Sequence, residues 1–129
     1  MPGDNAATVA PGTAVEFPNT EIATGGITRA SPSTFVLPAI GSYQVLFQVS
    51  LSPAGQLMLQ LNGADLPNTV VGRATSTCQI QGMQYVQTSV VNSTLAVVNP
   101  SGNSTALTIT PIAGGTRPVS AHLVITRVL

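Results

Sequence analysis

The sequence contains no lysine and no tryptophan, and charged residues of every kind are scarce. Four arginines balance four acidic residues among 129 positions, so 6% of the chain is charged and its formal net charge is zero. An ordinary soluble domain has about 25% charged residues. Binding to nucleic acid or to anionic lipid requires clustered cations. The composition therefore predicts neither a nucleic-acid partner nor insertion into a membrane.

Cysteine and long apolar runs are equally rare. The lone Cys78 cannot form an intrachain disulfide, and we expect it to be a buried structural thiol because its neighbours Thr77 and Gln79 offer no cation to stabilise a thiolate. The N-terminal residues show no charged start followed by an apolar stretch, and no run reaches the roughly 18 apolar residues of a membrane span. We therefore expect neither a signal peptide nor a spanning helix within this sequence.

Residues that could support catalysis are also few. The only imidazole is His122, inside a predicted strand, whereas nucleophilic catalysis needs a base beside the nucleophile and a group that orients it. The acids are not spaced like a hard-cation loop, nor like paired catalytic carboxylates: Asp4, Glu16, Glu21 and Asp65. We expect no enzymatic activity, no cofactor and no metal.

Neutral polar residues and turn formers make up for these absences. The chain has 16 Thr, 11 Ser, eight Gln and seven Asn, and its 12 Gly and ten Pro separate short apolar runs. Branched Thr suits the surface of a strand, and Gly and Pro mark turns. Length and punctuation predict one all-β domain, a two-sheet antiparallel jelly-roll sandwich of about ten short strands.

Period-two alternation locates the core most clearly in two stretches. From Gly41 to Leu51 and from Gln56 to Leu61, every second residue is apolar and is predicted to face inward, whereas Gln56, Met58 and Gln60 face outward. These stretches form a hairpin or lie opposite each other across the sandwich. The predicted core residues are Tyr43, Val45, Phe47, Val49, Leu57, Leu59, Leu61, Leu123 and Ile125.

Further strands are predicted by shorter patterns and by the turns between them. A flexible segment is expected at 1–12 and the jelly-roll domain at 13–129. Asn62-Gly63 predicts a tight turn and Leu66-Pro67-Asn68 a second one. The remaining predicted strands are Thr13–Phe17, Ile22–Thr24, Thr34–Leu37, Thr69–Thr77, Gln79–Val91, Ser93–Asn99, Thr105–Ile109 and Val119–Leu129.

The last predicted strand differs from the others because it is apolar on both faces. A strand of this kind must be covered on both sides, by its own core and by a neighbour. A chain without net charge also has little repulsion to prevent association. We therefore expect a homotrimer whose interface contains Val124, Val128, His122 and Thr126, with Met58 contributed by a strand of the same sheet.

Three segments carry a family resemblance. LPAIGSYQV (37–45) is similar to a Gly-x-Tyr-x-hydrophobic entry into a central strand, LNGADLPNT (61–69) to an Asn-Gly turn followed by a hydrophobic-Pro-x-Thr corner, and AHLVITRVL (121–129) to a closing strand. Together they resemble the C-terminal head domain of the collagen-like glycoproteins of the spore exosporium (the BclA type), within the tumour necrosis factor and complement globular-head superfamily.

This resemblance implies a trimeric jelly roll displayed on an outer surface, outside a cell or on the exosporium of a spore, at the tip of an upstream collagen-like stalk. The given sequence has no Gly-X-Y repeat, so such a stalk would precede it. Some relatives bind calcium near the three-fold axis through acidic side chains, a site that this chain is not expected to form. The function predicted first is thus a structural trimerisation and surface-display head.

The alternative is a lectin-like adhesin that binds a carbohydrate or a receptor on a host surface. Such a module needs exposed aromatic platforms, and Tyr85 is the one aromatic residue expected in solvent. Arg73, Arg117 and Arg127 are either ligand contacts or solvated and ion-paired side chains. Asn92-Ser93-Thr94 and Asn103-Ser104-Thr105 match the N-glycosylation pattern, either as acceptors or by chance in a Ser/Thr-rich chain.

Overall fold

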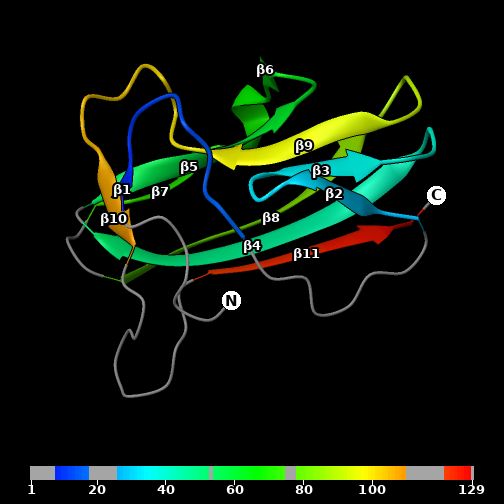
Figure 1. Ribbon diagram of the computed structural model, residues 1–129. Helices are drawn as coiled ribbons and strands as arrows, with labels where there is room; N and C mark the ends of the chain where they lie inside the picture. The colour runs from blue at the N-terminus through cyan, green and yellow to red at the C-terminus, as the bar shows by residue number, and fades with distance from the viewer. Residues whose placement is uncertain (1–7, 18–25, 53, 75–77, 110–120, 129) are drawn as a thin grey trace.

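The computed structural model describes residues 8–17, 26–52, 54–74, 78–109 and 121–128. It confirms the predicted all-β class: eleven strands pair antiparallel in two sheets that lie face to face, as expected for a jelly-roll-like sandwich (Figure 1). The single helical element in these ranges is the short 3-10 turn η1 (Pro67–Thr69).

The first sheet is built on β4 (Ser42–Ser52), the longest strand. β8 (Cys78–Gln87) runs along one side of β4, where Ser42 pairs with Gln87 and Leu51 with Cys78. On the other side β4 pairs with β11 (Ala121–Arg127) and then with β10 (Leu107–Ile109). The short β1 (Thr8–Val9) completes this sheet beside β10.

The second sheet contains β9 (Ser93–Val98) at its centre, between β3 (Thr34–Leu37) and β5 (Gly55–Leu61). The backbone N–H of Leu59 in β5 donates to Oγ1 of Thr69 in η1 at 2.9 Å, which joins this turn to the sheet. The remaining strands extend the sheet at its edges. In order across the sheet the strands are β2 (Thr28–Ser31), β3 (Thr34–Leu37), β9, β5 (Gly55–Leu61) and β6 (Ala64–Asp65), with β7 (Val71–Arg73) also paired to β5.

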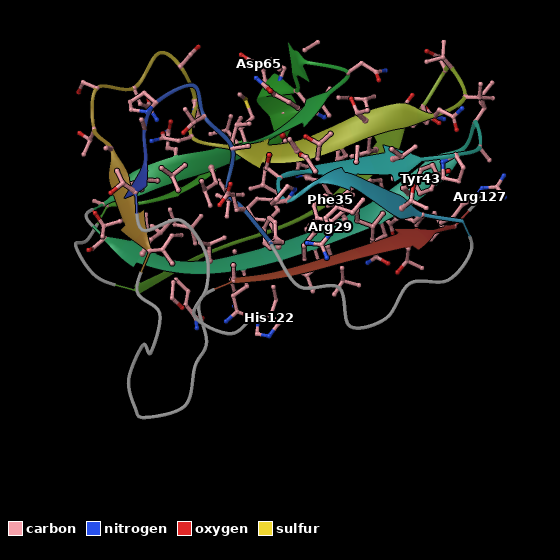
Figure 2. All side chains as sticks on the ribbon, in the orientation of Figure 1. Arg29, Phe35, Tyr43, Asp65, His122 and Arg127 are labelled. Carbon is pink, nitrogen blue, oxygen red and sulfur yellow. The ribbon has the colours of Figure 1, made fainter. Side chains whose placement is uncertain are left out.

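Side chains between the two sheets form one apolar core. The inward set of β4 is fully buried, and Figure 2 shows Tyr43 between the sheets, where its hydroxyl donates to the carbonyl of Ala39 at 2.7 Å. Of the predicted core, Tyr43, Val45, Phe47, Val49, Leu57 and Leu59 are buried, and Leu61, Leu123 and Ile125 are partly buried and pack against them.

The predicted Asn-Gly turn joins β5 to β6 with two residues. Asn62 and Gly63 have φ values of 53° and 79°, and Leu61 pairs with Ala64 across the turn. Two consecutive positive φ values are typical of the tight hairpin turn that matches the twist of antiparallel strands, and Asn and Gly adopt them at the lowest cost. This turn was therefore predictable from two residues.

Several strand predictions need correction near the N-terminus. Thr8–Val9 is already a strand and Val9 is buried, so the domain begins before residue 13. Thr13–Phe17 contributes only an isolated bridge between Ala14 and Val98, although Val15 and Phe17 are buried. β2 was not predicted, because its sequence Thr-Arg-Ala-Ser lacks an apolar alternation. Ile22–Thr24 lies outside the described residues.

Other boundaries are shorter than the sequence predicted. In the described part of Thr69–Thr77, residues 69–74, the strand after η1 has only the three residues of β7, and residues 75–77 lie outside the described residues. β8 ends at Gln87 because a turn occupies 88–92. The final strand spans Ala121–Arg127, and Leu129 lies outside the described residues. Of the two arrangements considered for β4 and β5, the structure has them in different sheets, so they face each other across the core.

Met58 is the one predicted interface residue that the fold places elsewhere. It lies in β5 of the second sheet, not in the sheet of β11, and it is 3% exposed. Its cross-strand neighbour Val98 is also buried, at 2%. The outward position of Met58 was inferred correctly from its alternation with Leu57 and Leu59, but that side of β5 is enclosed within the protomer.

Candidate functional site

The side of the first sheet that faces away from the second sheet is the candidate site. We call it the outer face and define it by three residues from each of three adjacent strands. They are Gln44, Leu46 and Gln48 of β4, Gln81, Met83 and Tyr85 of β8, and His122, Val124 and Thr126 of β11. Each is directed outward because its strand neighbours on both sides are turned toward the core.

Backbone register aligns these residues in three rows across the sheet. Val124 pairs with Leu46, and Leu46 pairs with Met83, which gives an apolar row. The side chains of this row are 51%, 42% and 57% exposed respectively. Cross-strand neighbours lie about 5 Å apart, so the three side chains form a continuous stripe. The protomer leaves this apolar stripe open to solvent.

A row of polar residues lies on each side of the stripe. His122 pairs with Gln48 and Gln48 with Gln81, whereas Thr126 pairs with Gln44 and Gln44 with Tyr85. The amide of Gln44 lies 3.1 Å from the sulfur of Met83 and so connects one of these rows to the stripe. None of the nine residues of the outer face carries a carboxylate, an ammonium or a guanidinium group.

His122 is exposed on this face, and Figure 2 shows it directed away from the second sheet. Its position agrees with the predicted side of β11, together with Val124 and Thr126. Val128 follows the strand, is 44% exposed, and its N–H donates to the carbonyl of Ser42 at 2.9 Å. These four residues share one side of the molecule.

Tyr85 is 66% exposed, which confirms the prediction that this aromatic ring is presented to solvent. Phe35, by contrast, is half-buried and makes an edge contact with Phe17, with ring centroids 6.1 Å apart. Since Tyr85 belongs to the outer face, the surface predicted for trimer contact and the ring predicted for ligand stacking occupy the same sheet. Trimer contact and ligand stacking would therefore use the same surface, the outer face.

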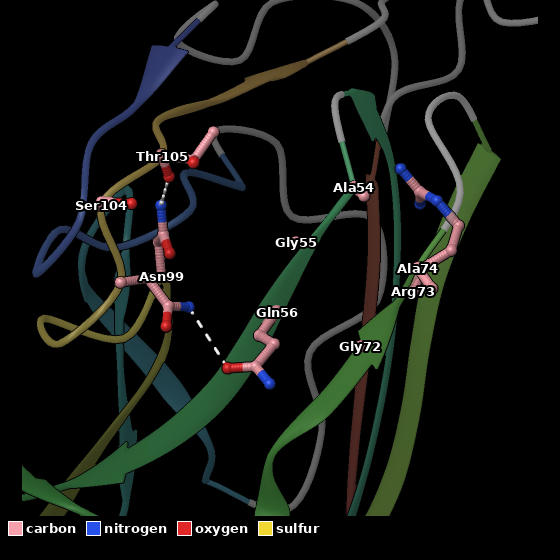
Figure 3. A pocket seen from close by; sticks show the side chains of 10 residues that line it. Ala54, Gly55, Gln56, Gly72, Arg73, Ala74, Asn99, Ser104 and Thr105 are labelled. Atoms are coloured by element: carbon pink, nitrogen blue, oxygen red, sulfur yellow. Dashed lines mark hydrogen bonds between the residues drawn. The ribbon is translucent and has the colours of Figure 1, made fainter.

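A polar hollow of about 590 Å³ lies at the end of the sandwich that contains β1 and β10 (Figure 3). Gln56 and Asn103 bridge part of it, because Asn103 Nδ2 donates to Gln56 Oε1 at 3.3 Å. Asn99 is buried and donates to the carbonyls of Val9 and Thr105 at 2.9 and 3.1 Å. The described lining offers no aromatic ring on which a sugar could stack.

The other candidate residues are separated in space. Arg73 donates to the carbonyl of Leu51 at 2.9 Å, and Arg127 donates to that of Ile40 at 3.4 Å. Asp65 accepts a hydrogen bond from Gln60 Nε2 at 2.8 Å at the edge of the second sheet. Arg117, Asp4, Glu21 and the side chain of Cys78 lie outside the described residues. Where the chain is described, no group of three or more metal-ligating side chains comes together.

The two glycosylation patterns differ in accessibility. Asn92 is exposed in the turn after β8, with a φ of 55°. Asn103 is half-buried, and its amide is engaged with Gln56. A glycan attached to Asn103 would have to break that hydrogen bond, so Asn92 is the more accessible acceptor of the two.

Comparison of the sequence with protein-family models and with curated proteins finds no match. Within the described ranges no helix is long and apolar enough to cross a membrane. The geometry of the outer face therefore has to carry the functional argument.

Sequence analysis missed two members of the apolar stripe. Leu46 interrupts the otherwise polar outward set of β4, and Met83 stands between Gln81 and Tyr85 on the outward side of β8. Each is a single apolar residue among exposed polar ones, which is common on protein surfaces and by itself does not indicate a contact. Only the pairing of β4 with both β8 and β11 aligns the two exceptions with Val124.

Proposed function

We propose that this chain is a non-enzymatic structural head domain that associates as a homotrimer through the outer face. The family resemblance adds that the trimer is displayed on an outer surface, such as the exosporium of a spore, at the tip of an upstream collagen-like stalk. The observation that supports the proposal best is the exposed apolar stripe of Val124, Leu46 and Met83 on a face without formal charge.

Symmetry explains why the missing charges favour self-association. Around a three-fold axis each residue near the axis meets its own copies, so one charged side chain would bring three like charges into a dry contact. Glutamine, threonine and neutral histidine can donate and accept hydrogen bonds among themselves without that cost. The outer face has the composition that such an arrangement needs.

Burial of the stripe would supply the driving force. Removing an exposed aliphatic side chain from water contributes about 1 to 2 kcal/mol, and each of the three stripe residues would contribute once per chain. Part of this sum is lost to the entropy of association and side-chain ordering. The remainder adds to the hydrogen bonds that the two flanking polar rows would make in the interface.

A charge in the stripe is the direct test. Val124→Asp should abolish the trimer, because three carboxylates would converge and lose their hydration. Thr108→Asp is the matched control, since Thr108 is exposed on β10 of the same sheet but is not among the nine residues of the outer face. Light scattering after size exclusion measures the mass of each. A monomeric wild type, or a trimeric Val124→Asp variant of unchanged melting temperature, would refute the proposal.

The upstream stalk can be tested without this domain. Reading the sequence that precedes residue 1 in the encoded protein should reveal a Gly-X-Y tract. If that region holds no such tract, the collagen-like part of the proposal is wrong, whereas self-association through the outer face is unaffected.

The carbohydrate-binding alternative is supported by the exposure of Tyr85. Sugar rings stack on exposed aromatic faces, and Gln44 and Gln87 lie near enough in the register to supply hydrogen bonds. A glycan array with wild type and Tyr85→Ala tests it, with Tyr85→Phe as a control that keeps the ring. Binding that is lost in Tyr85→Ala but retained in Tyr85→Phe would favour this function.

A further inference from the structure

Two turns come together at the end of the sandwich opposite β1 and β10 (Figure 1). The first turn, 38–41, precedes β4, and the second, 88–92, joins β8 to β9. At their apices stand Ile40, Val90 and Val91, which are 54%, 52% and 62% exposed. We call these three residues the aliphatic tip.

Hydrogen bonds hold the two turns together. The N–H of Thr88 donates to the carbonyl of Gly41 at 2.9 Å, and the N–H of Gly41 donates back to Thr88 Oγ1 at 3.0 Å. Asn92 N–H donates to the carbonyl of Pro38 at 3.1 Å, and Ser93 Oγ donates to that of Val90 at 2.9 Å. The tip is therefore a fixed part of the fold whose residues are ordered before any contact is made.

The residue types at these apices are unusual for turns. Gly, Pro, Asn, Asp and Ser dominate turns because they adopt the required dihedral angles or hydrogen-bond their own backbone. Two adjacent β-branched valines at the centre of an exposed turn offer neither advantage, and their exposure costs hydration free energy. Three exposed aliphatic side chains in two hydrogen-bonded turns indicate a contact with an apolar phase.

Charge near the tip has one sign among the described residues. Arg127, at the end of β11, donates from Nη2 to the carbonyl of Ile40 at 3.4 Å, and Figure 2 shows it at this end of the molecule. The described acids stand elsewhere: Glu16 follows the buried Val15, and Asp65 belongs to the β5–β6 hairpin. Aliphatic side chains beside a guanidinium match the acyl chains and phosphates of a lipid layer.

We propose that the aliphatic tip inserts into the surface of a lipid layer, with Arg127 placed at the level of the lipid phosphates. The inference rests on the protomer alone and does not require the trimer. A projecting tip suits a deformable lipid layer, and two tips brought together from separate molecules would place their Arg127 side chains in mutual repulsion. The sequence holds no cluster of cations, so the aliphatic side chains supply most of the binding and Arg127 adds only a preference for anionic lipid.

Flotation with lipid vesicles tests the proposal. Wild-type protein should float with vesicles of phosphatidylcholine mixed with phosphatidylglycerol, and less with phosphatidylcholine alone. The double variant Val90→Ser/Val91→Ser should bind at least about tenfold more weakly, because it removes two of the three aliphatic side chains. Arg127→Gln should abolish the preference for the anionic vesicles while leaving the remaining binding intact.

Val70→Ser is the matched control, because Val70 is another exposed valine but lies after η1, away from the tip. Circular dichroism and light scattering on every variant verify that fold and mass are unchanged. Absence of wild-type flotation, equal flotation by the double variant, or equal loss in Val70→Ser would overturn the proposal. A change in oligomer mass caused by the double variant would also overturn it, since the tip would then contact a second copy.

Discussion

The two sheets treat outward-facing apolar residues in opposite ways. In the second sheet Met58 and its neighbour Val98 are 3% and 2% exposed, so the protomer encloses them. In the first sheet Met83 and its neighbours Leu46 and Val124 remain between 42% and 57% exposed. A methionine that alternates with buried residues can thus belong either to the protein's own interior or to an exposed surface.

This difference separates residues that stabilise the folded protomer by themselves from residues whose burial would depend on association. Residues enclosed by the chain contribute to the free energy of unfolding whatever the protein concentration. Residues of the apolar stripe contribute fully only when another surface covers them, so their effect should depend on protein concentration. Three pairs of substitutions test the description of the two sheets.

The largest effect is expected at the inner side of β4. Phe47 is fully buried, so Phe47→Ala should lower the free energy of unfolding by about 3 to 5 kcal/mol through lost burial and the cavity left behind. Gln48→Ala, one residue away on the outer face, should change it by less than about 0.5 kcal/mol in dilute protein. Urea denaturation measures both, and equal losses would mean that the facing of β4 is wrong.

The two methionines give the most direct comparison. Met58→Ala should cost about 2 to 5 kcal/mol at every protein concentration, because Met58 is enclosed by its own chain. Met83→Ala should cost less than about 0.5 kcal/mol in dilute monomer and more as the concentration rises. Melting curves over a range of concentrations separate the two. Concentration-independent behaviour of both variants would argue against a contact at Met83.

The smallest of the three effects concerns the inner side of β8. A Cβ added at Gly82 would lie 2.5 Å from Cζ of Phe47, so the ring would have to move. Gly82→Ala should destabilise the domain by about 1 to 3 kcal/mol through overpacking. Gly102→Ala serves as its control, because nothing lies within 4 Å of a Cβ at that position. If thermal melting finds both variants equally stable, β8 does not press against Phe47 as described.

Prediction from sequence succeeded where a pattern was long or chemically specific. β4 has eleven residues and β5 has seven, enough for period-two alternation to identify the inward side of each. Asn62-Gly63 identified its turn because few other pairs adopt two positive φ values at low cost. Some short strands, such as β1, β2 and β6 with two to four residues, were not predicted because their sequences show no apolar alternation, whereas the four residues of β3 were predicted with the bounds that the structure has.

The sequence alone determined the class of the fold, the inward side of its longest strands, and the outward side of β11. These features depend on local chemistry: branched and apolar side chains at alternate positions, and turn residues between them. Only the tertiary structure decided that Met58 is enclosed, that Leu46 and Met83 align with Val124, and that the turns carrying Ile40 and Val90-Val91 are hydrogen-bonded to each other. Register and sheet order bring together residues far apart in the chain, and no local pattern encodes which strand will cover which face.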